Sequence, residues 1–490
     1  MLSDELTYQI QEELPFAPTA QQAKTMRVFA EFMTDRDPHA VMILRGSAGT
    51  GKTTLAGSIV RTMVRLQQKV MLLAPTGRAA KVFSLNSNHV AFTIHRKIYR
   101  QKSLLGKFSL NDNMHHDMLF LVDESSMIAN EGSPDAVFGS GYLLDDLVQY
   151  VYSGRNCRMV LIGDQAQLPP VGEERSPALQ AGMLSAYGLK VYEYTLTEVL
   201  RQAQDSGILF NANQIRTIGD GLLPKIRFKG FADIHIVRGD ELIETLSGSY
   251  SRVGIDETMV VTRSNKRANI YNQGIRNMVL DREEELSSGD MLMIVKNNYY
   301  WEPESPKLGD DRGLNKEGTA DSSDPQPPNL GGFGFIANGD RALVRRVRNS
   351  RDLFGFHFVD LWLQFPDYDD TELTATVIID SLHTEAPALT REQHERLFNA
   401  VMEDYDYIPQ KAERIKKLKS DPYYNALQIK YAYAVTCHKA QGGQWAHVYI
   451  DQGYMTDDML TPDYIHWLYT AFTRATEQLY LVNWPEKQQQ

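Results

Sequence analysis

The sequence predicts an α/β protein with two parallel-sheet lobes, one carrying a short insertion and the other a longer, β-rich insertion. Before Val191, short apolar runs that suit buried strands alternate with helical patterns, which is typical of parallel sheets with crossover helices. After Val191 the alternation resumes more loosely. Two stretches, Tyr99–Asp117 and Glu285–Leu427, break it. The length of 490 residues agrees with this division, since it predicts about three domains.

The elements of the first lobe follow from apolar runs that end in polar or glycine-containing turns. Val41–Leu44 ends just before Gly46 and is expected to be a buried strand. Lys52–Leu66 carries apolar residues at helical spacing and predicts a helix. Three further strands are expected in this lobe, at Val70–Ala74, Met118–Val122 and Met159–Ile162.

The second lobe and the insertions are predicted in the same way. Strands of the second lobe are expected at Thr258–Val261, His447–Ile450 and Leu479–Val482. Strands of the longer insertion are expected at Met291–Val295, Arg341–Val347 and Thr374–Ile379. The loop 302–334 is rich in Gly, Pro, Asp and Ser, so we expect it to be mobile or partner-dependent. Lys411–Lys419 predicts a solvated helix face, with a nucleic-acid patch as the alternative.

These expectations place the domain boundaries along the chain. The first lobe comprises 1–97 and 118–194, separated by the short insertion 98–117. The second lobe comprises 195–286 and 428–490, separated by the longer insertion 287–427.

Composition narrows the class of protein. Hydrophobic residues make up 42% and charged residues 23%, which is typical of globular proteins. The formal net charge of −11 means that any nucleic-acid surface must be a local basic strip on an acidic body. The two cysteines lie far apart, which disfavours a disulfide framework or a zinc site. No long apolar run or signal segment is evident, so we expect a cytoplasmic protein without membrane contact.

A phosphate-binding loop is predicted where the first strand meets the first long helix. The stretch Gly46–Thr53 has the pattern G-x-x-x-x-G-K-[ST], in which backbone N–H groups and the helix N-terminus face the phosphates of ATP. Lys52 would contact the outer phosphates, and Thr53 would bind Mg²⁺. The candidate nucleotide-binding residues of the loop are Gly46, Ser47, Ala48, Gly49, Thr50, Gly51, Lys52, Thr53 and Thr54.

Other polar residues at strand ends complete a candidate hydrolytic site. Asp123 suits the metal shell, and Glu124 would deprotonate the attacking water, although adjacent carboxylates are also common on surfaces. Gln167 would reach the γ-phosphate from Gly163–Pro170, which could also be an ordinary proline-rich turn. Gln22, or its neighbour Gln21, would contact the adenine edge. Two arginines, Arg201 and Arg474, are candidates for stabilising the transferred phosphoryl group.

Eight polar or glycine-containing stretches follow one another along the chain: Gly46–Thr53, Leu73–Ala80, Thr93–His95, Val122–Met127, Leu161–Gly172, Leu196–Gln202, Ala434–Gly443 and Tyr469–Ala475. Together they resemble the superfamily 1 helicases, and within them the 5′-to-3′ branch of RecD-like and Dda-type DNA helicases. Pro75–Ala80 and Gly163–Pro170 are similar to that branch rather than to the 3′-to-5′ enzymes.

The resemblance implies two RecA-like P-loop NTPase lobes that bind ATP and Mg²⁺ between them and move on single-stranded DNA. It also implies a pin in the short insertion, with Phe108 as a candidate wedge, and an SH3-like subdomain in the longer one. The implied strand contacts are Pro75, Thr76, Arg78, Thr93, His95, Thr436, His438 and Lys439.

Alternatives remain at single residues and for the whole chain. His95 and His438 could be packed histidines, and Trp445 could stack a base or belong to the core. The resemblance implies DNA junctions as substrates and a monomer, and names no protein partner. A translocase without unwinding, a strand-sensing ATPase switch and an RNA-directed helicase are the rival functions.

Overall fold

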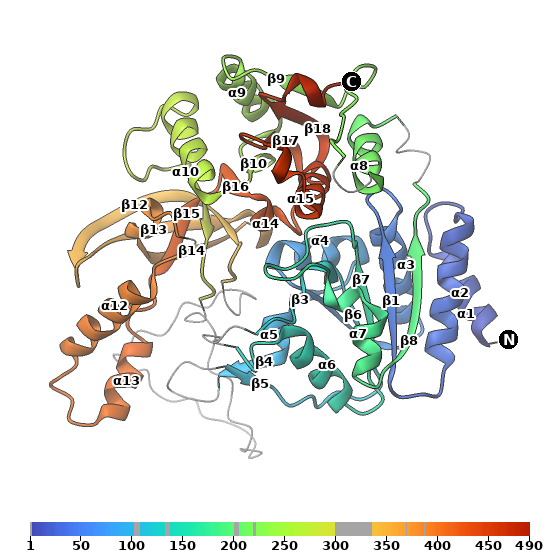
Figure 1. Ribbon diagram of the computed structural model, residues 1–490. Coiled ribbons are helices and arrows are strands. Elements are labelled where there is room, and N and C mark those ends of the chain that lie inside the picture. Colours follow the sequence, from blue (N-terminus) through green and yellow to red (C-terminus); the bar gives the residue numbers. More distant parts are fainter. Residues whose placement is uncertain are drawn as a thin grey trace. The chain divides into compact units, whose positions relative to one another are not determined.

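The computed structural model describes residues 2–101, 108–132, 138–199, 205–218, 222–298, 336–368, 370–386 and 388–490. The chain forms two compact units. The first unit comprises Met1–Leu292, Glu385–Pro387 and Tyr431–Gln490, and the second comprises Met293–Thr384 and Ala388–Lys430. The first unit contains both parallel sheets, labelled in Figure 1.

The first sheet has six parallel strands in the order β3-β2-β6-β7-β1-β8. The four strands predicted for this lobe are confirmed, whereas the three-residue β3 and the partly exposed edge strand β8 were not predicted. The strands are β1 (Ala40–Gly46), β2 (Lys69–Ala74), β3 (Ala91–Thr93), β6 (Met118–Val122), β7 (Arg158–Gly163) and β8 (Lys190–Leu196).

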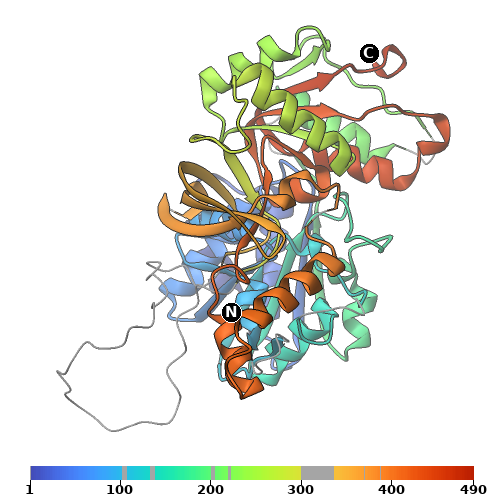
Figure 2. The same cartoon turned by 90° about the vertical axis from the view of Figure 1, so that its left-hand side faces the viewer.

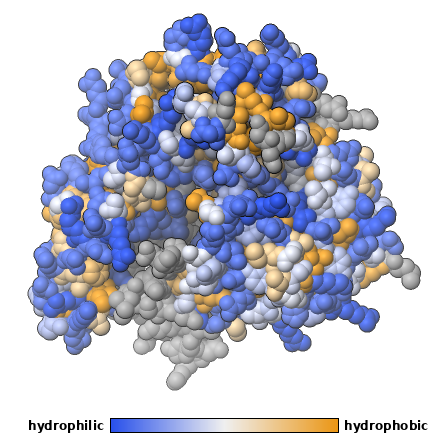
Figure 3. All heavy atoms as spheres, in the orientation of Figure 1, coloured by the Kyte–Doolittle hydropathy of each residue, from blue (hydrophilic) through white to orange (hydrophobic). Residues whose placement is uncertain are grey.

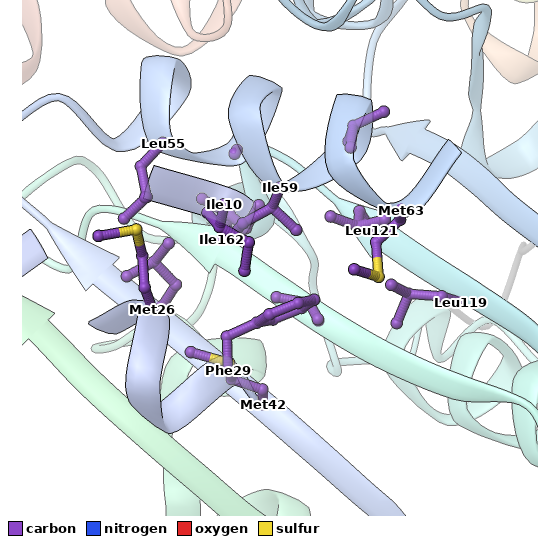
Figure 4. Close-up of a cluster of buried hydrophobic side chains, with 14 of the residues drawn as sticks. Ile10, Met26, Phe29, Met42, Leu55, Ile59, Met63, Leu119, Leu121 and Ile162 are labelled. Atoms are coloured by element: carbon purple, nitrogen blue, oxygen red, sulfur yellow. The ribbon is translucent and has the colours of Figure 1, made fainter. Parts of the chain in front are cut away.

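Helices cover this sheet and bury its apolar side chains. In Figure 4, Leu55, Ile59 and Met63 of α3 point toward side chains of α2 and of the strands β1 and β6. The predicted helix at Lys52–Leu66 is thereby confirmed as α3. The helices of this lobe are α1 (Leu2–Glu12), α2 (Ala20–Thr34), α3 (Lys52–Arg65), α4 (Gly77–Ser87), α5 (Ile94–Ile98), α6 (Leu143–Ser153) and α7 (Ala181–Ala186).

The second sheet has five parallel strands in the order β16-β10-β17-β18-β9, which confirms the second parallel-sheet lobe. Its strands are β9 (Ile234–Val237), β10 (Thr258–Thr262), β16 (Ala434–Thr436), β17 (Trp445–Asp451) and β18 (Ala475–Val482). Its helices are α8 (Gly207–Thr217), α9 (Leu242–Val253), α10 (Asn265–Gly274), α14 (Cys437–Ala440) and α15 (Pro462–Phe472).

The short insertion of the first lobe forms a small antiparallel hairpin, β4 (Tyr99–Gln101) and β5 (Phe108–Leu110). The Phe108 side chain is only 8% exposed and stacks on Phe138, with ring centroids 4.8 Å apart. A wedge has to be exposed to meet a duplex, so the suggestion that Phe108 is the wedge is wrong. Residues 102–107, between the two strands, lie outside the described residues.

The longer insertion forms a closed five-stranded barrel, which confirms the expected β-rich, SH3-like element. Its strands are β11 (Met291–Ile294), β12 (Arg341–Leu353), β13 (Phe356–Phe365), β14 (Thr371–Ile378) and β15 (Leu427–Tyr431). Figure 2 shows β12 and β13 as long, curved strands in orange. The loop 302–334 lies outside the described residues, so the expectation of its mobility stays a prediction.

Between β14 and β15 the chain forms the helices α11 (Asp380–His383), α12 (Arg391–Asp404) and α13 (Lys411–Lys419). The predicted helix at Lys411–Lys419 is confirmed, and Leu418 is its one buried residue. The sequence pattern did not predict α12. A capping box begins this helix, because Thr390 and Gln393 exchange side-chain and backbone hydrogen bonds.

The molecular face drawn in Figure 3 is mostly hydrophilic, with scattered apolar residues. Within the described ranges, no helix has both the length and the apolar character needed to cross a bilayer.

Candidate nucleotide and strand site

The phosphate loop joins β1 to α3 and is shaped by its glycines and its own hydrogen bonds. A Cβ at Gly46 would lie 2.8 Å from Lys52 Cγ, so only glycine fits there. Gly51 caps α3 in the left-handed region, with φ +79°. Thr50 Oγ1 and Lys52 Nζ both donate to the Ser47 carbonyl, at 2.8 and 3.0 Å. The loop is therefore a preformed structure at the carboxyl end of a buried strand.

Gln22 lies against this loop. Its side chain is fully buried at the first turn of α2, and its Nε2 donates to the Thr50 carbonyl at 3.3 Å. Its Oε1 accepts from Thr19 N in the capping box of the helix. The neighbouring Gln21 instead bonds Thr197 and Glu198. The structure thus brings Gln22, and not Gln21, to the loop. The Gln22 amide is hydrogen-bonded to backbone atoms of Thr50 and Thr19. Contact of Gln22 with adenine stays a prediction.

The two carboxylates follow β6, next to the loop. Asp123 Oδ1 accepts from Glu124 N at 2.9 Å. Burial, and secondly the charge of Glu124, raise the pKa of Asp123 to about 7, while Lys52 acts in the opposite direction. Glu124 has φ +50°, a left-handed conformation that is strained for a residue with a side chain. Such a strained carboxylate beside a charged partner is typical of a functional site.

Several buried polar atoms at this site lack protein partners within the described part of the chain. They are Ser47 Oγ on the loop, Ser126 Oγ after β6 and Gln167 Oε1 after β7. An unsatisfied buried polar atom costs about 1–3 kcal/mol, so native proteins keep few of them. Atoms of this kind, gathered on three strand-end turns, suit a polar ligand such as a nucleotide.

Residues of the second lobe reach the same turns. The Tyr469 hydroxyl accepts from Ala48 N at 2.9 Å and donates to Asp164 Oδ2 at 2.5 Å. Thr470 Oγ1 accepts from Leu168 N at 2.7 Å, and Gln441 Nε2 donates to the Leu168 carbonyl at 2.7 Å. The phosphate loop and the β7 turn are therefore hydrogen-bonded to α15 and to the segment after α14.

The two predicted arginines have different outcomes. Arg201 lies outside the described residues. Arg474 is 2% exposed and donates to the carbonyls of Thr470 and Gly443 and to Thr473 Oγ1, at 2.9–3.0 Å. These partners all belong to the second lobe, so the structure does not bring Arg474 to the phosphate loop. A phosphate contact for this side chain stays a prediction and requires it to exchange these partners.

The predicted strand contacts of the first lobe lie at the ends of β2 and β3. Thr76 Oγ1 accepts from Ala79 N and caps α4, and Thr93 Oγ1 accepts from Arg96 N and caps α5. Pro75 is half-buried beside Thr76. Both hydroxyls therefore have a structural task in addition to any contact with a nucleic acid.

Arg78 bridges to the second lobe. Its guanidinium donates to the Gln444 carbonyl and lies 4.6 Å from the ring centroid of Trp445. Trp445 is only 2% exposed. Of the two interpretations of this tryptophan, the core residue is therefore correct, since a buried ring cannot stack a base.

His95 is half-buried among aromatic rings rather than open to a strand. Its ring lies 5.1 Å from Phe138 and 5.6 Å from Tyr99. Burial lowers the pKa of His95 to about 4, so the imidazole is neutral near pH 7. This environment favours the packed interpretation of His95, and its contact with a strand stays a prediction.

The second-lobe candidates follow β16. Thr436 is the N-cap residue of α14, His438 is exposed, and Lys439 is half-buried. A Cβ at Gly442, which has φ +71°, would lie 3.1 Å from Thr76 Oγ1. The segment after α14 therefore touches the β2–α4 turn, which brings the candidate strand contacts of the two lobes together.

Three residues at this site were not among the predicted ones. Asp164 and Tyr469 lie inside stretches that the sequence pattern singled out, where Gln167 and Arg474 were preferred instead. Arg216 of α8 acts electrostatically on the Tyr469 hydroxyl. Leu209, on the same helix, would lie 3.2 Å from a Cβ placed at Gly49 of the phosphate loop. The helical spacing between Leu209 and Arg216 is the sequence signal that could have placed both on the helix face next to the loop.

Two family models match the chain. One, described as an AAA domain, matches residues 17–221, and the other, described as a UvrD-like helicase C-terminal domain, matches residues 431–482.

Two curated relatives are helicases. The chain is 31% identical to the ATP-dependent RecD2 DNA helicase of Deinococcus radiodurans over 178 residues, which cover 35% of this chain and 21% of the relative. It is 25% identical to the ATP-dependent DNA helicase dda of Enterobacteria phage T4 over 266 residues, which cover 51% of this chain and 55% of the relative. The chain thus spans less than two thirds of the length of either relative.

A solved structure of the Pif1 helicase from Bacteroides, in complex with ADP-AlF3 and ssDNA, matches with a TM-score of 0.46 and 14% identity. The match covers 96% of this chain and 94% of that one.

Proposed function

Because this chain belongs to the superfamily 1 helicases, in the RecD-like and Dda-like branch, we propose that it is an ATP-dependent DNA helicase that moves 5′ to 3′ on single-stranded DNA. One observation supports this proposal above the others. Residues of the second lobe contact both the phosphate loop, through Tyr469, and the predicted strand contact Arg78, through the Gln444 carbonyl. Nucleotide and strand would therefore act on the same pair of lobes.

At the nucleotide, the roles follow from charge and position. Lys52 would neutralise the outer phosphates, and the unsatisfied Ser47 Oγ and Gln167 Oε1 would gain ligand partners. Thr53 and Asp123 would hold Mg²⁺, which when bound supplies positive charge to the β- and γ-phosphates. A cation there also favours the charged form of Asp123, whose pKa is raised in its absence. Glu124 would accept the proton of the attacking water.

At the strand, contacts would be made to phosphates rather than to bases. Thr76, Arg78, Thr436, His438 and Lys439 offer hydroxyl, guanidinium, imidazole and ammonium groups, which bind phosphates without reading sequence. We therefore propose low sequence specificity and a binding constant that falls steeply with salt. The proposed domain boundaries are those derived from the sequence.

The rate of ATP hydrolysis tests this proposal. It is measured alone, with single-stranded DNA and with single-stranded RNA of the same sequence. We expect slow hydrolysis alone and strong stimulation by DNA. Stimulation by RNA alone would mean that the substrate is RNA and not DNA. A rate of hydrolysis that neither strand changes would contradict a motor coupled to a strand.

A further inference from the structure

The Tyr469 hydroxyl lies between two functional segments of the first lobe. It accepts from Ala48 N of the phosphate loop and donates to Asp164 Oδ2 at the end of β7. The side chain is 1% exposed. Burial and the Asp164 carboxylate hold the pKa of Tyr469 well above its ordinary value, so the hydroxyl keeps its proton. It can therefore serve as donor and acceptor at the same time.

The Ala48 N–H is one of the amides that this type of loop directs at a phosphate. In the structure the tyrosine hydroxyl holds that amide. A phosphate oxygen that binds the Ala48 N–H must therefore replace the Tyr469 hydroxyl, because one N–H makes one strong hydrogen bond.

Neighbouring residues of α15 would transmit such an exchange. Thr470 Oγ1 accepts from Leu168 N at 2.7 Å, and His466 Nδ1 lies 2.9 Å from the Ala166 carbonyl. Both partners belong to the same β7 turn as Asp164. Of the contacts that α15 makes through Tyr469, Thr470 and His466, only the one to Ala48 lies on the phosphate loop, and the others lie on the β7 turn.

A second tyrosine of α15 shows what a purely structural role looks like. The Tyr464 hydroxyl donates to Gln452 Oε1 at 2.7 Å and accepts from Gln488 Nε2 at 2.9 Å. Tyr464 is 1% exposed, as Tyr469 is. Its partners all lie in the second lobe, so the same substitution at Tyr464 controls for the loss of a buried hydroxyl in this helix.

We propose that Tyr469 is a positioning residue that couples occupancy of the phosphate loop to the second lobe, because nucleotide phosphate and its hydroxyl compete for the Ala48 N–H. When phosphate takes this amide, Tyr469 keeps Asp164 as its partner, and α15 loses its only direct side-chain bond to the loop within the described residues. The inference rests on the proposed function, in which the loop binds ATP.

The test compares Tyr469→Phe with Tyr464→Phe. ADP affinity is measured by calorimetry without nucleic acid, and the ATPase rate with and without single-stranded DNA. Tyr469→Phe removes the competing hydroxyl and keeps the ring, so ADP should bind about two- to tenfold more tightly than to the wild type. Stimulation of the ATPase by DNA should fall, because one link between the loop and the second lobe is lost. Tyr464→Phe should leave ADP affinity unchanged.

Thermal unfolding shows whether each variant is folded. A second variant keeps the inference testable if Tyr469→Phe does not fold. Asp164→Asn removes the charge that holds the hydroxyl in place and should also tighten ADP binding. Equal or weaker ADP binding by Tyr469→Phe overturns the inference, and so does an equal shift in both tyrosine variants. If neither the wild type nor the variants bind ADP, the proposed nucleotide site itself is wrong and the inference falls with it.

Discussion

Lys52 and Glu124 have different proposed roles, Lys52 in binding the nucleotide and Glu124 in hydrolysis. Lys52 is the charged residue of the loop, and its ammonium group acts on the half-buried Asp123. Glu124 follows Asp123 directly and keeps a strained backbone, with φ +50°. A strained conformation persists only where the surrounding structure holds it, which suits a residue with a functional role. The two side chains should therefore fail in different ways when they are changed.

We expect Lys52→Ala to weaken ATP binding and abolish turnover, because the phosphates lose their main counter-charge. Glu124→Gln should keep ATP binding and lower the rate of hydrolysis by about 10²- to 10⁴-fold, since the neutral amide cannot accept a proton. ATP affinity and single-turnover hydrolysis measure the two effects. Glu31→Gln, at an exposed position of α2, is the matched control. Hydrolysis at nearly the wild-type rate by Glu124→Gln would exclude Glu124 as the base.

At the scale of elements, the hairpin β4–β5 is joined to the first lobe by an aromatic cluster. Phe138 lies 4.8 Å from Phe108 and 5.4 Å from Tyr99, and Tyr99 donates from its hydroxyl to the buried Asp146 at 2.7 Å. The cluster would fix the direction of the hairpin, which a pin needs in order to split a duplex.

Phe138→Ala should therefore lower duplex unwinding several-fold and leave DNA-stimulated ATP hydrolysis nearly unchanged. The substitution removes ring contacts at the base of the hairpin and touches no nucleotide residue. Unwinding and ATPase rates are measured on the same preparation, with Phe138→Leu as an apolar control. Parallel losses of both rates would mean that the cluster supports the whole lobe rather than the hairpin.

The barrel has a pH-sensitive carboxyl group. Asp340 is 2% exposed and accepts from Ala337 N and from the Tyr368 hydroxyl, both at 2.7 Å. Burial raises the pKa of Asp340 from 3.8 to about 7. The folded state then holds a proton that the unfolded chain releases, so this group's contribution to stability falls as the pH rises from about 4 to about 7.

Asp340→Asn removes this titration. Its melting temperature should rise relative to the wild type between about pH 5 and pH 7 and then stay level, because the wild-type penalty is complete above its pKa. Thermal unfolding over that range measures the effect, with Glu372→Gln at an exposed position of β14 as the control. A difference that does not depend on pH would show that Asp340 does not titrate in this range.

Elements with a strong local pattern could be predicted from the sequence. β6 and α3 are confirmed within about a residue, since a continuous apolar run and a helical spacing are local signals. β8 and α12 were not predicted for the same reason, since neither carries a strong apolar pattern. β8 is a partly exposed edge strand with many polar residues, and α12 is a largely polar helix with only two buried residues, Leu397 and Val401.

Within the site, the sequence located the segments better than the individual contacts. Lys52 of the loop acts electrostatically on Asp123, because strand ends at one edge of a parallel sheet are neighbours, and the roles of Lys52, Asp123 and Glu124 stay predictions. The partners of Tyr469 and the packing of Trp445 were not predictable. They depend on contacts between residues more than 300 positions apart, such as Arg78 and Gln444, with |i−j| of 366.

As a whole molecule, the protein is acidic, although its proposed partner is an anionic strand. The net charge of −11 opposes long-range attraction of an anionic strand, so the proposed binding would depend on the local groups after β2, β3 and β16. These groups and the nucleotide residues lie at the carboxyl ends of the strands in two parallel sheets. Hydrogen bonds from α15 of the second lobe to Ala48 and Leu168 join it to the first lobe.

Unwinding of three matched DNA duplexes, with a 5′ tail, with a 3′ tail and without a tail, would show whether the protein is a 5′-to-3′ helicase. ATP-dependent unwinding of the 5′-tailed duplex alone is the predicted result. Equal unwinding of the 3′-tailed duplex would contradict the assigned direction. If ATP hydrolysis is stimulated by DNA and no duplex opens, the chain is a translocase rather than a helicase.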